Sequence, residues 1–112
     1  VLLLIIIGAK LKLPDDPHVI ELLPEFVDDW TENIKSNYPK YLKEKNSEEL
    51  YRLAHTLKGS CFQFSIDDIA EMGLDTMQYI KNEDWDKIAE MEGKLLKAFD
   101  EVNEFLKKEG LK

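Results

Sequence analysis

The helical pattern of this chain is clearest in the stretch LYRLAHTLKGSCFQF, which runs from residue 50 to residue 64. Its apolar residues recur at three- and four-residue spacing, as on the buried stripe of an α-helix. They are Leu50, Leu53, Leu57, Cys61 and Phe64. At about 100° per residue, His55 points roughly 140° away from the centre of that stripe. The sequence therefore predicts a helix on which His55 faces solvent.

Two neighbours of His55 on this helix are unusual in combination. Lys58 and Gly59 follow it by three and four residues, the spacing at which side chains lie over one another on a helix surface. A glycine inside a helix costs about 1 kcal/mol relative to alanine, which suggests that something comes close to the backbone at Gly59. An imidazole beside a cation and a missing side chain can be reached by another protein.

The residues AHTLKGS, from Ala54 to Ser60, resemble the signature of the histidine-containing phosphotransfer (HPt) domain family. That signature is an alanine, the phospho-accepting histidine, and a lysine-glycine pair three and four residues later. The resemblance extends over about residues 22–105 and includes the acidic helix that begins LLPEF. The chain departs from the family at Phe62, where alanine is usual, and at Ser65, where glycine is common.

The resemblance implies a phosphorelay intermediate in two-component signal transduction. His55 would accept a phosphoryl group from the aspartyl phosphate of a receiver domain and pass it to another receiver. Lys58 would stabilise charge on the phosphoryl group, and Gly59 would lie on the partner-binding surface. The helical spacing adds Phe62 and Gln63 to that surface, with the alternative that Phe62 packs against a neighbouring helix. The expected partners are receiver domains of response regulators and a hybrid sensor kinase. No cofactor or metal is expected in this chain, because the receiver would supply the Mg²⁺.

Composition narrows the function classes further. The chain has 112 residues, with 23 acidic against 15 basic side chains and a net charge of −8. This charge opposes binding to nucleic acid and to anionic membranes. The single cysteine excludes an internal disulfide framework. No Gly-rich phosphate loop occurs, so we expect a stoichiometric phosphotransfer protein without the ATP site of a kinase. The predicted location is the cytoplasm. The domain there is either free-standing or part of a larger membrane-associated sensor kinase.

The N-terminal residues differ in character from the rest. Residues 1–16 comprise an apolar arm, Val1–Ile7, and a linker rich in proline and aspartate, and residues 17–112 form the predicted bundle domain. Seven apolar residues are too few for a spanning helix, which needs about 20. The arm can be the end of an upstream segment, part of a signal region, residues added for expression, or an arm folded on the bundle or on a second copy.

Four amphipathic helices are predicted in the domain, at about residues 17–45, 47–64, 66–81 and 84–108. The apolar stripe of the first includes Leu22, Leu23, Val27, Trp30, Ile34 and Tyr38. Pro24 either divides a short leading helix from the long one or sits in a first turn, and Pro39 predicts a kink or a break near Tyr38.

Start signals mark the later helices. Asn46 followed by two glutamates is a capping pattern. The run from Ser65 to Asp68 has the form of a capping box for the third helix. Gly73 is predicted to allow close helix packing, and Cys61 to behave as a small hydrophobe. Short connections favour antiparallel neighbours, so the predicted fold is all-α, an up-down-up-down four-helix bundle with a short N-terminal leading helix.

Two other functions remain open at this point. A surface histidine in an acidic helix needs no function, so the chain can be a non-catalytic interaction or adaptor bundle that tolerates loss of His55. It can also be a membrane-tethered helical domain, for which Val1–Ile7 is the only support. The joint occurrence of an exposed histidine, Lys58, Gly59 and four helices favours phosphotransfer. His18 has no such neighbours and is assigned no role.

Overall fold

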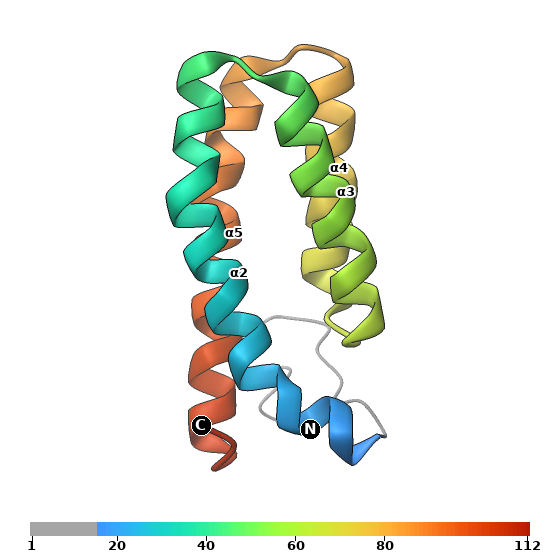
Figure 1. Ribbon diagram of the computed structural model, residues 1–112, viewed down its shortest axis with the longest axis vertical. Coiled ribbons are helices and arrows are strands. Elements are labelled where there is room, and N and C mark those ends of the chain that lie inside the picture. The colour runs from blue at the N-terminus through green and yellow to red at the C-terminus, as the bar shows by residue number, and fades with distance from the viewer. Residues whose placement is uncertain (1–15) are drawn as a thin grey trace.

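Four α-helices joined by short turns make up the described part of this computed structural model, residues 16–112. They are α2 (Pro17–Glu44), α3 (Ser47–Gln63), α4 (Asp67–Lys81) and α5 (Trp85–Lys108). In Figure 1 the chain rises along α2, descends along α3, rises along α4 and descends along α5. The predicted all-α fold is confirmed for these residues, whereas the predicted arm Val1–Ile7 lies outside them.

Side chains cap the N-termini of three helices. The Asp16 carboxylate accepts a hydrogen bond from the backbone N–H of His18 at the start of α2 (2.9 Å). Asn46 accepts from the N–H of Glu49 at the start of α3 (3.2 Å), which confirms the predicted start. Asp84 caps α5 in the same way. These bonds satisfy N–H groups that have no partner within the helix.

The predicted capping box at Ser65 is wrong. The residue before α4 is Ile66, which makes no side-chain capping bond, and Ser65 has a left-handed backbone with φ of 62°. The N–H of Ser65 donates to the carbonyl of Phe62 (3.1 Å) and that of Ile66 to the carbonyl of Cys61 (2.8 Å). This pair of bonds is the Schellman motif, which ends a helix. Ser65 therefore terminates α3 instead of starting α4.

Helix α2 runs without a break through both of its internal prolines, Pro24 and Pro39. Of the predicted kink or break near Tyr38, a break is excluded, and no separate leading helix ends at Pro24. Each proline removes one backbone hydrogen bond. Pro39 is exposed, so water can reach the carbonyl that loses its partner, and buried residues on both sides hold the helix to the core. In Figure 1 the first turns of α2 are inclined to the rest of the helix, as a proline can cause.

The apolar stripes of the four helices meet in one core. Tyr38 of α2 is fully buried and its hydroxyl donates to the carbonyl of Ile88 in α5 (2.6 Å). Burial, with a contribution from the charge of Glu92, raises the pKa of the Tyr38 hydroxyl. Cys61 is also fully buried, as predicted, and burial raises the pKa of its thiol to about 12. One predicted core residue is wrongly placed, since Leu22 is 52% exposed.

The helices pair unequally. α3 packs most extensively on α4, α2 and α4 each pack on α5, and the contact between α2 and α3 is the slightest of these. The predicted role of Gly73 is confirmed, because a Cβ there would lie 3.1 Å from the carbonyl oxygen of Ala54 and 3.2 Å from the backbone nitrogen of Lys58. A side chain at this position would push the two helix backbones apart by a few tenths of an ångström. Within residues 16–112, no helix is both long enough and apolar enough to span a membrane.

Candidate functional site

His55 lies midway along α3 with its side chain exposed, as the sequence predicts. The neighbouring positions Ala54 and Leu57 are buried and fix that side of the helix against the core. Among the described residues, no hydrogen bond or ion pair engages the imidazole. Both ring nitrogens are therefore available to a molecule that approaches from solvent.

Lys58 and Gly59 follow His55 by three and four residues within α3, the spacing that places residues on one side of a helix. Lys58 is half-buried, and its ammonium forms no ion pair within the described chain. Gly59 is exposed, and a Cβ built on it would meet no atom within 4 Å. The glycine is thus not required by packing inside the domain. The open space and the unpaired cation lie on the same part of α3 as His55.

Helix α4 supports this part of α3 from behind. A Cβ built on Gly73 would lie within 3.3 Å of the backbone at Ala54 and Lys58, so the turn that carries His55 packs closely on α4. Backbone packing of this kind leaves little room for the turn to shift. The imidazole therefore extends from a helix backbone, that of α3, whose position is fixed by packing on α4.

Two further predicted residues lie near the C-terminal end of α3. Phe62 is 45% exposed, and Gln63, the last residue of the helix, is also exposed. The aromatic ring of Phe62 does not fold into the core. Its neighbour Phe64 does the opposite, since it stacks on Phe26 of α2 with ring centroids 4.0 Å apart. We call His55, Lys58, Gly59 and Phe62 the His55 face.

One neighbour of the imidazole was not predicted. The ring of Tyr51, one turn before His55, lies nearly parallel to the imidazole, with centroids 6.5 Å apart and an interplanar angle of 18°. The ammonium of Lys81, at the end of α4, lies 5.7 Å from the centroid of the Tyr51 ring. The four-residue spacing of Tyr51 and His55 was a usable signal. The contact with Lys81 was not readable, because it depends on how α3 and α4 pair.

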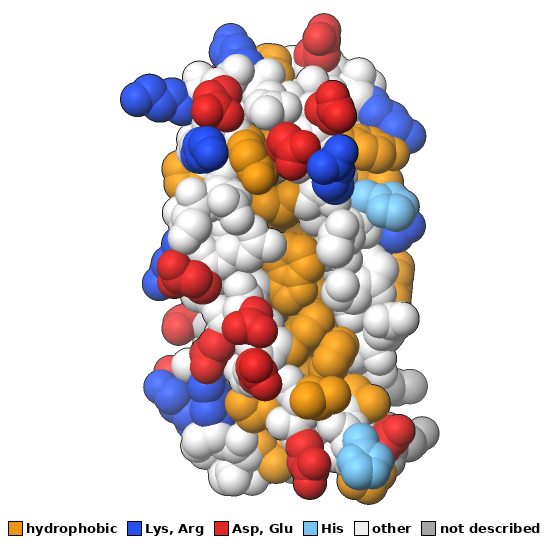
Figure 2. Space-filling model, viewed as in Figure 1, with side chains coloured by type: hydrophobic (Ala, Val, Ile, Leu, Met, Phe, Trp, Pro, Cys, Tyr) orange, Lys and Arg blue, Asp and Glu red, His pale blue; other side chains and the backbone are white. Residues whose placement is uncertain are grey.

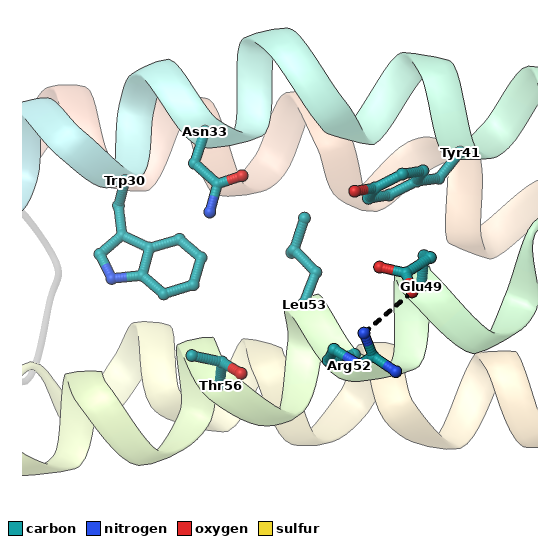
Figure 3. Close-up of a pocket in the computed structure, with 7 residues that line it drawn as sticks. All are labelled: Trp30, Asn33, Tyr41, Glu49, Arg52, Leu53 and Thr56. Atoms are coloured by element: carbon teal, nitrogen blue, oxygen red, sulfur yellow. Dashed lines mark ion pairs between the residues drawn. The ribbon is translucent and has the colours of Figure 1, made fainter.

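A second unpredicted feature is a cleft of about 190 Å³ between α2 and α3. Figure 2 shows an apolar band down the middle of this face of the molecule, and Figure 3 shows the cleft in close-up. Its lining residues are Trp30, Asn33, Tyr41, Glu49, Arg52, Leu53 and Thr56. His55 is not among them, so the cleft and the His55 face are separate features that share α3.

The charge of the cleft is largely compensated. Arg52 pairs with Glu49 (Nη1 to Oε1, 3.1 Å; Figure 3) and with Glu48 (Nη2 to Oε1, 3.6 Å). These two carboxylates offset part of the positive charge that an anionic ligand would meet at Arg52. Within residues 16–112, no group of three or more His, Cys, Asp or Glu side chains could hold a metal ion.

Comparison of the chain with protein-family models, with curated proteins and with solved structures gave no match.

Proposed function

We propose that this chain is a phosphorelay intermediate of the HPt type, built as an antiparallel up-down-up-down bundle. His55 accepts a phosphoryl group from the aspartyl phosphate of a receiver domain and passes it to another receiver. The observation that carries the proposal is the exposed imidazole of His55, with open space over Gly59 and with Lys58, whose ammonium forms no ion pair to residues 16–112, on the same part of α3.

The transfer needs little from the accepting protein. The unprotonated ring nitrogen of His55 attacks phosphorus, and an N–P bond forms as the P–O bond to the receiver's aspartate breaks. The electron pair of that bond leaves with the aspartate carboxylate, and the other ring nitrogen keeps its proton. The same steps in reverse deliver the phosphoryl group to a second receiver. The Mg²⁺ that offsets the phosphate charge belongs to the receiver.

Each residue of the His55 face has a role in this scheme. Lys58 acts as a mobile point cation near the phosphoryl oxygens. Gly59 leaves room for the receiver's loops to bring their aspartate to the imidazole, while Phe62 and Gln63 contact the receiver beside it. Receiver domains, alone or within a hybrid sensor kinase, are the proposed partners, and the cytoplasm is the proposed location.

The proposal is tested by phosphorylation from a panel of phosphorylated receivers in the presence of Mg²⁺. The wild-type chain should gain a label that is labile in acid and stable in alkali, as a phosphoramidate is. His55→Gln should abolish the label with little change in thermal stability, because the side chain is exposed. The matched control is His18→Gln, which removes the only other histidine and should leave labelling intact. Labelling of His55→Gln at the wild-type level would contradict the assignment of His55 as the phosphoryl acceptor.

A second candidate is an interaction bundle without phosphochemistry. The cleft between α2 and α3 favours it, because the cleft has aromatic walls and does not include His55. In that case no receiver labels the wild type, and a partner would be lost on substitution of Trp30 or Tyr41 instead of His55. The same receiver panel, followed by a binding assay on these variants, separates the two functions.

A further inference from the structure

The contact between Tyr51 and His55 places an aromatic ring directly behind the imidazole. Side chains on an α-helix lean toward its N-terminus, onto the residues three and four positions before. His55 therefore leans toward Tyr51, and the two rings lie nearly parallel at a centroid distance of 6.5 Å. This is within the range of offset-stacked aromatic pairs. Among the described residues, Tyr51 is the only ring that contacts the imidazole.

Tyr51 is in turn held from the other helix. It is half-buried and packs against the core, unlike the exposed His55. The ammonium of Lys81 lies 5.7 Å from the centroid of its ring, within the distance of a cation–π contact. The Tyr51 ring thus has the cation of α4 and the imidazole of α3 as neighbours, and its packing against the core limits its own rotation.

We infer that Tyr51, held by Lys81, is a positioning residue for phosphoryl transfer at His55, an inference that rests on the proposed function. A free exposed imidazole samples several rotamers, and only some of them point a ring nitrogen in line with an incoming phosphorus. Stacking on Tyr51 restricts the ring to rotamers that lean over the preceding turn. Bond formation and bond breaking are unchanged, because Tyr51 touches neither the phosphoryl group nor the proton.

The first arm of the test measures the imidazole itself, without a receiver. In the wild type, NMR should show nuclear Overhauser contacts between the ring protons of His55 and Tyr51, and Hα–Hβ couplings of His55 that report one dominant rotamer. Tyr51→Leu, which keeps an apolar side chain at the core edge, should average these couplings. Tyr51→Phe retains the ring and should preserve the wild-type couplings.

The second arm measures transfer from a phosphorylated receiver. Tyr51→Leu should lower the maximal transfer rate by about threefold to tenfold, with the receiver concentration for half-maximal rate unchanged. Tyr51→Phe should transfer at the wild-type rate, and Lys81→Gln should fall between the two. A separate loss of docking would instead raise the half-maximal concentration.

The chain offers a matched control for both arms. Tyr79 is another half-buried tyrosine at the core edge with a lysine ammonium over its ring, that of Lys87 at 5.6 Å from the centroid, but it has no histidine beside it. Tyr79→Leu tests the general cost of removing such a pair, and it should leave the His55 couplings and the transfer rate unchanged.

The outcomes separate this inference from the proposed function. Wild-type couplings and wild-type rates in folded Tyr51→Leu would overturn the positioning role while leaving His55 as the acceptor. An equal loss of transfer rate in Tyr79→Leu would also overturn the positioning role. The lower rate of Tyr51→Leu would then come from a general loss of stability. If no receiver labels the wild type, the proposed function fails and the positioning role fails with it, whatever the NMR arm shows.

Discussion

At the scale of single residues, Gly59 is a position where stability and function make opposite demands. It lies in a helix interior with open space around it, so a larger residue would fit and would favour the helix by about 1 kcal/mol. We predict that Gly59→Leu raises the melting temperature and blocks phosphoryl transfer from receivers, because the new side chain fills the approach to His55. Thermal unfolding and a transfer assay on the same sample check both parts.

A second glycine supplies the control. Gly93 is also exposed in a helix interior, in α5, and a Cβ there would meet nothing within 4 Å. Gly93→Leu should therefore give a similar gain in stability and leave transfer unchanged. Transfer at the wild-type rate by folded Gly59→Leu would show that receivers do not dock over this part of α3.

Phe62 and Phe64 should respond in opposite ways to truncation, although only one residue separates them. Phe62 is 45% exposed, and we predict that Phe62→Ala weakens receiver binding by about 2 kcal/mol with little change in melting temperature. Phe64 stacks on Phe26, so Phe64→Ala should lower the melting temperature instead. Calorimetric titration with a receiver, together with thermal unfolding, distinguishes the two. Equal receiver affinity for Phe62→Ala and wild type would remove Phe62 from the interface.

At the scale of the helices and their turns, Ser65 stores backbone strain. A left-handed conformation costs an L-residue roughly 1–2 kcal/mol, whereas glycine adopts it freely. We predict that Ser65→Gly stabilises the fold by about 0.5–1 kcal/mol, because glycine adopts this conformation without strain. Ser60→Gly is the matched change inside α3 and should destabilise by a similar amount. Urea unfolding measures both, and a loss of stability in Ser65→Gly would contradict the strain argument.

The same turn illustrates which parts of the fold could be predicted from sequence. The helices were predictable because apolar periodicity and caps such as Asn46 are local signals. At Ser65 the sequence is ambiguous, because a serine with aspartates two and three residues later fits the start of a helix as well as the end of one. The helix does not break at Pro39, because the local cost of the proline is opposed by the burial of Tyr38. That burial is a tertiary effect, which the local sequence pattern does not report.

The candidate site also contains features that local sequence signals predict and features that they do not. The exposure of His55 and the placement of Lys58 and Gly59 follow from helical spacing alone, so the sequence predicted them. The support from Gly73, the contact of Tyr51 with Lys81 and the cleft at Trp30 all depend on how helices pair. No local pattern in one sequence reports the distance between two helices.

At the scale of the whole molecule, a buried thiol and a buried phenol should make the folded chain less stable at alkaline pH. Burial raises the pKa of the Cys61 thiol to about 12 and also raises that of the Tyr38 hydroxyl. An unfolded chain releases these protons near about pH 8.5 and 10, respectively, while the folded chain still holds them. The free energy of unfolding should therefore be unaffected by these groups below about pH 8 and should fall as the pH rises further.

The expected slope is up to about 1.4 kcal/mol per pH unit for each group that is ionised only in the unfolded chain. Urea unfolding at a series of pH values measures it. Cys61→Ala should lower stability at every pH by leaving a cavity, but the decline between about pH 8.5 and 10 should become shallower. A decline of the same steepness in Cys61→Ala and wild type would show that the thiol contributes nothing to it.

Because Cys61 is buried, the rate at which its thiol reacts reports how often the core opens. It is the only cysteine in the sequence, and it lies fully buried on the helix that carries His55. A thiol reagent can modify it only while the core beneath α3 is transiently open, so the labelling rate counts such openings. If receiver binding clamps α3 onto α4, bound chains will label more slowly than free ones. Docking could then be followed in a mixture of unmodified proteins, without a fluorophore and without phosphorylation.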